Sequence, residues 1–112
     1  MIIRIYKQKK ILQLWRATQL LKEYPVAVGK NQGQKEKEGD LRTPEGEYVV
    51  CVKNPHSKYH LSLGLNYPNN EDAKRGLENG VISTQEYQAI CDANNQGGIP
   101  PWKTALGGEI YI

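Results

Sequence analysis

The fold of this chain is decided between Gly39 and Val52, where the sequence reads GDLRTPEGEYVVCV. Thr43 to Gly46 has the Pro and Gly composition of a tight turn. The six residues behind it, 47–52, are rich in β-branched side chains, which is typical of a buried strand. Residues 30–42, in front of the turn, are almost wholly polar, with two glycines and alternating Lys and Glu. We predict a long solvated loop there, the part of the chain best suited to disorder, followed by a turn and a strand.

Upstream of this stretch, two short apolar runs predict a β-hairpin. Ile3 to Ile5 and Ile11 to Trp15 are separated by four polar residues, a spacing that suits a hairpin connection. Residues 20–28 predict a third strand. Pro25 places that strand at a sheet edge or a bulge, because proline has no N–H to donate to a neighbouring strand.

Downstream of it, residues 59–65 alternate between apolar and polar side chains. This period of two predicts a half-buried strand. One face carries Tyr59, Leu61, Leu63 and Leu65, and the other carries His60, Ser62 and Gly64.

Two helices are predicted before the C-terminal part of the chain. Ser83 and Glu86 form a capping-box pattern ahead of apolar residues at helical spacing, which predicts a helix over residues 83–94. Residues 71–77 predict a shorter helix, and residues 106–112 a final strand. The expected fold is one domain, residues 1–112, that is mainly β: a sandwich-like or barrel-like sheet assembly with one or two inserted helices.

Composition and charge exclude several functions. The 112 residues carry a formal charge of +3 with Lys, Arg, Asp and Glu interspersed, which gives no support to nucleic-acid binding. No apolar run approaches the length of a membrane span, and charge interrupts the N-terminus too early for an export signal. Cys51 and Cys91 lack the CxxC spacing of a metal site or a disulfide framework. No cofactor or metal is expected.

Four segments carry a resemblance to a known family. Residues 24–30, YPVAVGK, followed by residues 39–48, GDLRTPEGEY, resemble the opening strands of the L,D-transpeptidase (YkuD-like) catalytic domain. In that family a strand ending in V-G is joined by a polar loop to a D-x-x-T-P-x-G-x-[YF] turn. Residues 54–72 resemble the subgroup with a helical insertion before the catalytic strand. Residues 106–112 are similar to the strand that leads into the family's His-Gly, so the resemblance covers residues 2–112.

The resemblance implies a murein (peptidoglycan) peptide cross-linking or peptide-hydrolysing enzyme of the bacterial cell envelope or periplasm. In the family a Cys thiolate attacks a peptide carbonyl of the murein stem while a His acts as base. The family's His-Gly and Ser-x-Gly-Cys motifs are not found in residues 1–112. We therefore expect a domain that is incomplete at its C-terminus, with no catalytic residue to assign, and inactive as an isolated chain. The alternative is a non-catalytic cell-wall peptide-binding or regulatory module.

Four residues are candidates for binding the stem peptide: His60, Ser62, Asn66 and Tyr67. A histidine is able to act as a base near neutral pH, although an exposed strand histidine explains His60 as well. Turn formation around Pro68 explains Asn66 equally well. The two cysteines are interpreted as packing residues, as small thiols usually are.

The last predicted strand has a consequence for association. A strand ending at Ile112 presents unpaired backbone groups, and such an edge pairs readily with another chain. We expect self-association or domain swapping through this strand.

Overall fold

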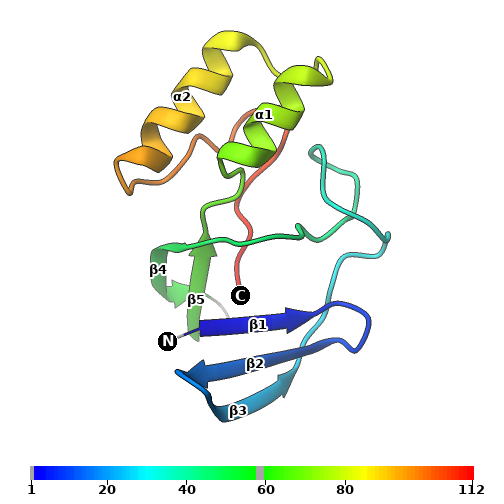
Figure 1. Ribbon diagram of the computed structural model, residues 1–112, viewed down its shortest axis with the longest axis vertical. Coiled ribbons are helices and arrows are strands. Elements are labelled where there is room, and N and C mark those ends of the chain that lie inside the picture. Colours follow the sequence, from blue (N-terminus) through cyan, green and yellow to red (C-terminus); the bar gives the residue numbers. More distant parts are fainter. Residues whose placement is uncertain (1, 58–59) are drawn as a thin grey trace.

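The computed structural model describes residues 2–57 and 60–112. Figure 1 shows the two helices at one end, a three-stranded sheet at the other, and a two-stranded hairpin between them. The elements in chain order are β1 (Ile2–Tyr6), β2 (Ile11–Arg16), β3 (Gln19–Pro25), β4 (Val50–Ser57), β5 (His60–Leu65), α1 (Asn70–Glu78) and α2 (Thr84–Asn95). A mainly β fold with two helices inserted after β5 is therefore confirmed.

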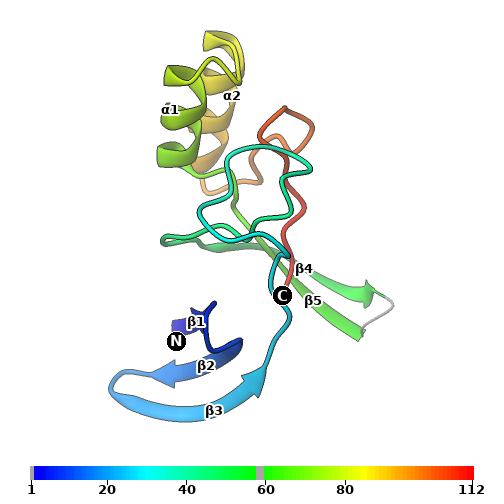
Figure 2. The same ribbon diagram turned by 90° about the vertical axis from the view of Figure 1, so that its right-hand side faces the viewer.

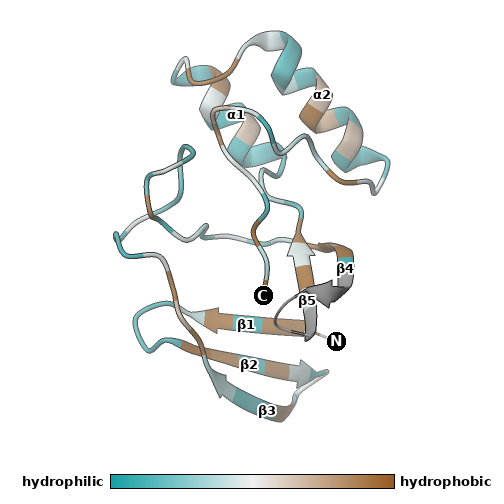
Figure 3. Ribbon diagram, turned by 180° about the vertical axis from the view of Figure 1, so that it is seen from behind, coloured by the Kyte–Doolittle hydropathy of each residue, from teal (hydrophilic) through white to brown (hydrophobic). Residues whose placement is uncertain are grey.

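The N-terminal sheet is an antiparallel meander in the order β1-β2-β3. The predicted hairpin is confirmed, with Ile3 opposite Leu14 and Ile5 opposite Leu12. The third strand is also confirmed, but it ends at Pro25, on an edge strand where its missing N–H costs nothing. No residue of β2 or β3 is fully buried, although β2 is largely apolar (Figure 3).

The β4 and β5 hairpin lies at an angle to the first sheet in Figure 2. Strand β4 begins at Val50, three residues later than predicted, and Val49 is 65% exposed. The prediction of a buried strand from residue 47 is therefore wrong. Strand β5 is confirmed, but its more buried face carries Ser62 and Gly64, because the side chains of Val52 and Tyr111 cover Gly64. Tyr59 lies outside the described residues, as does the side chain of Leu61.

Both helices begin at a capping box, which was predicted for α2 alone. Ser83 is the N-cap of α2 and exchanges hydrogen bonds with Glu86, as the sequence indicated. Asn69 caps α1 and exchanges the same pair of bonds with Asp72. Each cap satisfies two amide groups that a helix otherwise leaves unpaired.

The best-buried apolar cluster lies between the helices and the C-terminal part of the chain. It contains Ala73, Ile82, Ile90, Cys91 and Leu106. Burying these five side chains removes apolar surface from water, which is the main stabilising term in folding. The cluster therefore fixes α1, α2 and the segment around Leu106 as one unit.

The predicted last strand is shorter than expected. Only residues 110–112 pair with another strand, through a single bridge between Tyr111 and Gly64 and the hydrogen bonds around it. Residues 106–109 instead pack against the helices and the polar loop, so they cannot be extended along a sheet.

Candidate functional site

The C-terminal segment is seated on the free edge of β5. The N–H of Leu65 donates to the carbonyl of Ile110 at 2.8 Å. The N–H of Leu63 donates to the carbonyl of Ile112 at 2.7 Å, and Ile112 returns a bond to Leu63 at 2.9 Å. Gly64 is needed at this crossing, because a Cβ would lie 3.1 Å from the Tyr111 ring and would overlap Val52. Strand β5 is therefore paired on both sides at this end.

The preceding segment, residues 100–108, is anchored by buried contacts. Pro100 and Leu106 have almost no exposed surface. The hydroxyl of Tyr67 donates to the carbonyl of Leu106 at 2.8 Å, and both partners are buried. Trp102 packs against Gly108, where a Cβ would overlap its ring, and meets Tyr111 edge to face at 5.8 Å. The approach to residues 110–112 is thus held by packing on several sides.

The polar loop is organised around Asp40. Its carboxylate accepts hydrogen bonds from the backbone N–H groups of Glu36, Lys37 and Arg42. It also forms an ion pair with Lys35 at 3.0 Å, and both side chains are more than nine-tenths buried. Burial alone would raise the pKa of Asp40, but these bonds outweigh it and hold the pKa well below the ordinary value of 3.8. The expectation of a fully solvated, disorder-prone loop is therefore wrong at its centre.

The turn at Thr43 to Gly46 is tied to both neighbours. The Thr43 hydroxyl accepts a bond from the N–H of Gly29 at 2.6 Å. Gly29 has no room for a side chain, because a Cβ would lie 2.6 Å from the carbonyl of Leu41. Lys7, from the end of the first hairpin, donates to the carbonyl of Thr43 at 2.7 Å and pairs with Glu45 at 3.0 Å. The D-x-x-T-P-x-G sequence therefore joins the N-terminal sheet to the loop.

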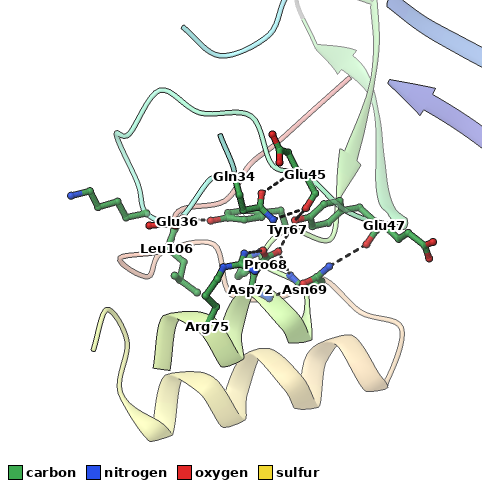
Figure 4. Close-up of polar contacts among 12 residues, drawn as sticks. Gln34, Glu36, Glu45, Glu47, Tyr67, Pro68, Asn69, Asp72, Arg75 and Leu106 are labelled. Atoms are coloured by element: carbon green, nitrogen blue, oxygen red, sulfur yellow. Dashed lines mark hydrogen bonds and ion pairs between the residues drawn. The ribbon is translucent and has the colours of Figure 1, made fainter. Parts of the chain in front are cut away.

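A buried carboxylate connects this turn to α1. Asp72 is 3% exposed and accepts bonds from the Tyr48 hydroxyl at 2.8 Å and the Asn69 N–H at 3.0 Å. Figure 4 shows Asp72 between Asn69 and Arg75, which also donates to it. Burial, followed by the negative charge of Asp72, raises the pKa of Tyr48 far above its usual value of 10. Tyr48 is therefore a neutral hydrogen-bond donor at physiological pH.

The cap at Asp72 was not identified from sequence, although the signal was present. Asn69 and Asp72 stand three residues apart before a helical stretch, which is the same spacing that identified Ser83 and Glu86. The ion pair of Lys35 with Asp40 had no comparable signal, because Lys and Asp in a polar run usually stay solvated.

An open hollow of about 540 Å³ lies between the turn and the ends of the two helices. Its walls are mainly amide and carboxylate side chains: Gly46, Glu47, Asn66, Asn69, Asn70, Glu71, Asn94 and Asn95. Asn94 donates to the Pro68 carbonyl at 3.0 Å and to Asn70 at 3.1 Å. Amide groups both donate and accept, which suits a peptide backbone.

The four predicted stem-peptide residues lie in different environments. Asn66 lines the hollow, and its side-chain oxygen accepts a bond from the N–H of Val49 at 2.7 Å. Tyr67 is fully buried, and Ser62 is 9% exposed. His60 lies in β5, but its side chain is outside the part that the structure describes. Contact of these residues with a stem peptide stays a prediction.

Neither cysteine has the surroundings of a nucleophile. Cys91 is buried in the cluster between the helices. Burial raises the pKa of the Cys51 thiol, which leaves less of the reactive thiolate. The register places His60 opposite Ser57 and Cys51 near the other end of the hairpin, between Val50 and Val52. At about 3.3 Å per residue along a strand, the backbones of Cys51 and His60 are roughly 15–20 Å apart.

Two further observations concern residues 2–57 and 60–112. No three His, Cys, Asp or Glu side chains in these ranges gather closely enough to hold a metal ion. No helix there is long and apolar enough to cross a membrane.

Comparison with known proteins identifies what this arrangement is similar to. The family model of the YkuD L,D-transpeptidase catalytic domain matches residues 1–112. YafK of Escherichia coli K12 and YafK of strain O157:H7, both of which carry the name of an L,D-transpeptidase, are each 31% identical over 83 residues. That match covers 68% of this chain but 34% of each relative, so the chain spans about a third of their length. No solved structure matches.

Proposed function

Since the chain belongs to the L,D-transpeptidase (YkuD) catalytic domain family, we propose that it contributes to murein peptide cross-linking or peptide hydrolysis in the bacterial cell envelope. The observation that carries this proposal is the family match over residues 1–112. The contacts of Asp40, Thr43 and Tyr48 make the residues that carry the resemblance integral to the fold, which agrees with the family match.

The reaction class breaks one amide bond and transfers the acyl group to an amine or to water. A Cys thiolate attacks the carbonyl of a stem peptide bond, a thioester forms, and the leaving amine takes its proton from a His. An incoming amine or water then breaks the thioester and returns the thiol. The stem peptide is the substrate, and we place Asn66 and the hollow that it lines among the groups that receive it.

The 112-residue chain is proposed to be inactive by itself. Neither Cys51 nor Cys91 stands in a Ser-x-Gly-Cys sequence, and no His is followed by Gly. The raised pKa of Cys51 and the burial of Cys91 agree with packing roles.

The test is incubation of the chain with murein tetrapeptide, followed by mass spectrometry of the products. We expect no release or exchange of the terminal D-residue. Release that disappears in Cys51→Ala but persists in the matched control Cys91→Ala would contradict the proposed inactivity.

A second candidate function is a cell-wall peptide-binding or regulatory module. The observation that favours it is the amide-lined hollow at Asn66, which is able to bind a peptide without any nucleophile. Sedimentation with purified sacculi tests it. Binding without turnover supports this module, whereas a chain that stays in the supernatant argues against it.

A further inference from the structure

A second hollow lies between the polar loop and the segment that leads to the C-terminal residues. Its volume is about 560 Å³, and it is lined by Glu38, Trp102, Lys103, Thr104, Ala105 and Glu109. It shares no lining residue with the hollow at Asn66. No step of the proposed reaction involves this second hollow.

The walls of this hollow are held in place by backbone contacts. The N–H of Glu38 donates to the carbonyl of Ala105 at 2.8 Å, which joins the two walls. The N–H of Gly107 donates to the carbonyl of Thr104 at 3.0 Å, and the buried side chain of Leu106 anchors the turn between them. A site that is already ordered loses little conformational entropy when a ligand binds.

The lining combines an aromatic ring with unused polar groups of both kinds. Trp102 is half-buried. In the part of the chain that the structure describes, the side chains of Glu38, Lys103 and Glu109 form no ion pair or hydrogen bond. Two carboxylates accept hydrogen bonds and one ammonium donates them. Charges of opposite sign disfavour both a simple anion and a simple cation, whereas a neutral ligand with many hydroxyl groups satisfies both.

One local feature indicates that the hollow is incomplete without a ligand. The indole Nε1 of Trp102 is buried and has no hydrogen-bond partner among the described residues. A ligand hydroxyl group that reached Nε1 would supply the missing acceptor.

We propose that this hollow is a saccharide-binding subsite, with the sugar ring against Trp102 and its hydroxyl groups bonded to Glu38, Lys103 and Glu109. The identity of the sugar rests on the proposed function: in murein the saccharide is the N-acetylhexosamine glycan that carries the stem peptides. The subsite would hold the glycan strand while the peptide is presented elsewhere on the domain.

The test titrates the 112-residue chain with the β-1,4-linked tetramer of N-acetylglucosamine and follows the two tryptophan indole signals by ¹H–¹⁵N NMR. Trp102→Phe and Trp15→Phe assign the signals. Trp15 lies in the N-terminal sheet and donates to Gln13 at 2.9 Å, so it is an internal control. We expect the Trp102 signal to shift in a saturable way while the Trp15 signal stays in place.

Calorimetry then measures the affinity of variants. Trp102→Ala is expected to bind about tenfold or more weakly, as is usual when a central aromatic residue is removed, while Trp15→Phe binds as the wild type does. Circular dichroism checks that both variants fold. If Trp102→Ala does not fold, the NMR titration of the wild-type chain still shows whether the tetramer binds at Trp102.

An unmoved Trp102 signal at millimolar tetramer would overturn the subsite, and so would equal affinity of a folded Trp102→Ala variant. Binding of murein tetrapeptide without sugar is measured separately. Tetramer binding without peptide binding supports the subsite and counts against the stem-peptide role, and the reverse result overturns the subsite alone.

Discussion

Replacing Asp72 with alanine tests the buried contact that joins the turn to α1. In the wild type this carboxylate accepts bonds from Tyr48, Asn69 and Arg75. Alanine removes all of these acceptors at once. We expect a large loss in the free energy of unfolding, because a buried donor without a partner keeps its full desolvation cost.

The magnitude follows from the three contacts taken in turn. Loss of the reciprocal cap at Asn69 costs about 0.5–1 kcal/mol. The half-buried Tyr48 hydroxyl would keep a long contact to the Glu45 carbonyl at 3.5 Å, and the loss of its short bond to Asp72 costs about 1–3 kcal/mol. Arg75 is more than a third exposed, so its ion pair is screened by water and adds about 0.5 kcal/mol. The expected total is about 3 kcal/mol, a large share of the stability of a domain this size.

Glu86→Ala is the matched control, because Glu86 occupies the same capping position in α2. Its side chain accepts from the N–H of Ser83 at 3.0 Å, but Glu86 is half-buried and binds no tyrosine hydroxyl. We expect this variant to lose about 0.5–1 kcal/mol. Urea unfolding followed by circular dichroism measures both variants. Equal losses within about 0.5 kcal/mol would refute the argument that burial and Tyr48 make Asp72 the costlier site.

Three further predictions concern other contacts. Tyr67→Phe removes the bond to the Leu106 carbonyl and should cost about 1–2 kcal/mol in urea unfolding, and a loss below about 0.3 kcal/mol would mean that this bond contributes nothing. Asp40→Asn should be less stable than the wild type above about pH 4. The difference should shrink as the pH falls below 3.8, because the unfolded state then takes up a proton that the folded carboxylate, with its lowered pKa, still resists. A pH-independent difference would contradict this reasoning. Gly64→Ala forces a Cβ against Val52 and Tyr111 and should cost about 1–3 kcal/mol. Gly98→Ala, where the backbone is not left-handed and a Cβ would meet the Ala93 carbonyl oxygen at 3.4 Å, controls for the loss of glycine itself, and equal losses would show that overlap is not the cause.

Features that depend on neighbouring residues were predictable from the sequence. The first hairpin and the start of α2 follow from apolar spacing and from a cap that closes within four residues. The edge position of Pro25 follows from its missing backbone N–H, because no distant contact is able to supply that donor. Each of these signals is complete within one short window of sequence.

Features that depend on distant contacts were not predictable in the same way. The buried face of β5 is set by Tyr111, which lies 47 positions beyond Gly64 in the sequence. The burial of Lys35 requires Asp40 on one side and the ring of Tyr67 at 5.9 Å on the other. A run of polar residues contains no signal that one of them has a distant buried partner. The loop was therefore expected to be solvated.

The candidate site shows the same division. Asn66 was proposed because the family resemblance places the turn around Pro68 near the entrance to the pocket. Asn66 lines a hollow, and its contact with a stem peptide stays a prediction. Tyr67, next to it, has its hydroxyl bonded inside the domain. Neighbours in a turn point in different directions, so sequence proximity alone could not separate a lining residue from a buried one.

The residues that carry the family resemblance make contacts that hold the fold together. Asp40 organises the loop, Thr43 bonds to Gly29, and Tyr48 bonds to Asp72. Each of these bonds either joins segments that are distant in sequence or closes a turn of the backbone. None of them holds a nucleophile or a base in an open position. The motif therefore reports how the scaffold is built. Family membership follows from it directly, whereas activity depends on groups outside this motif, and the two have to be tested by separate experiments.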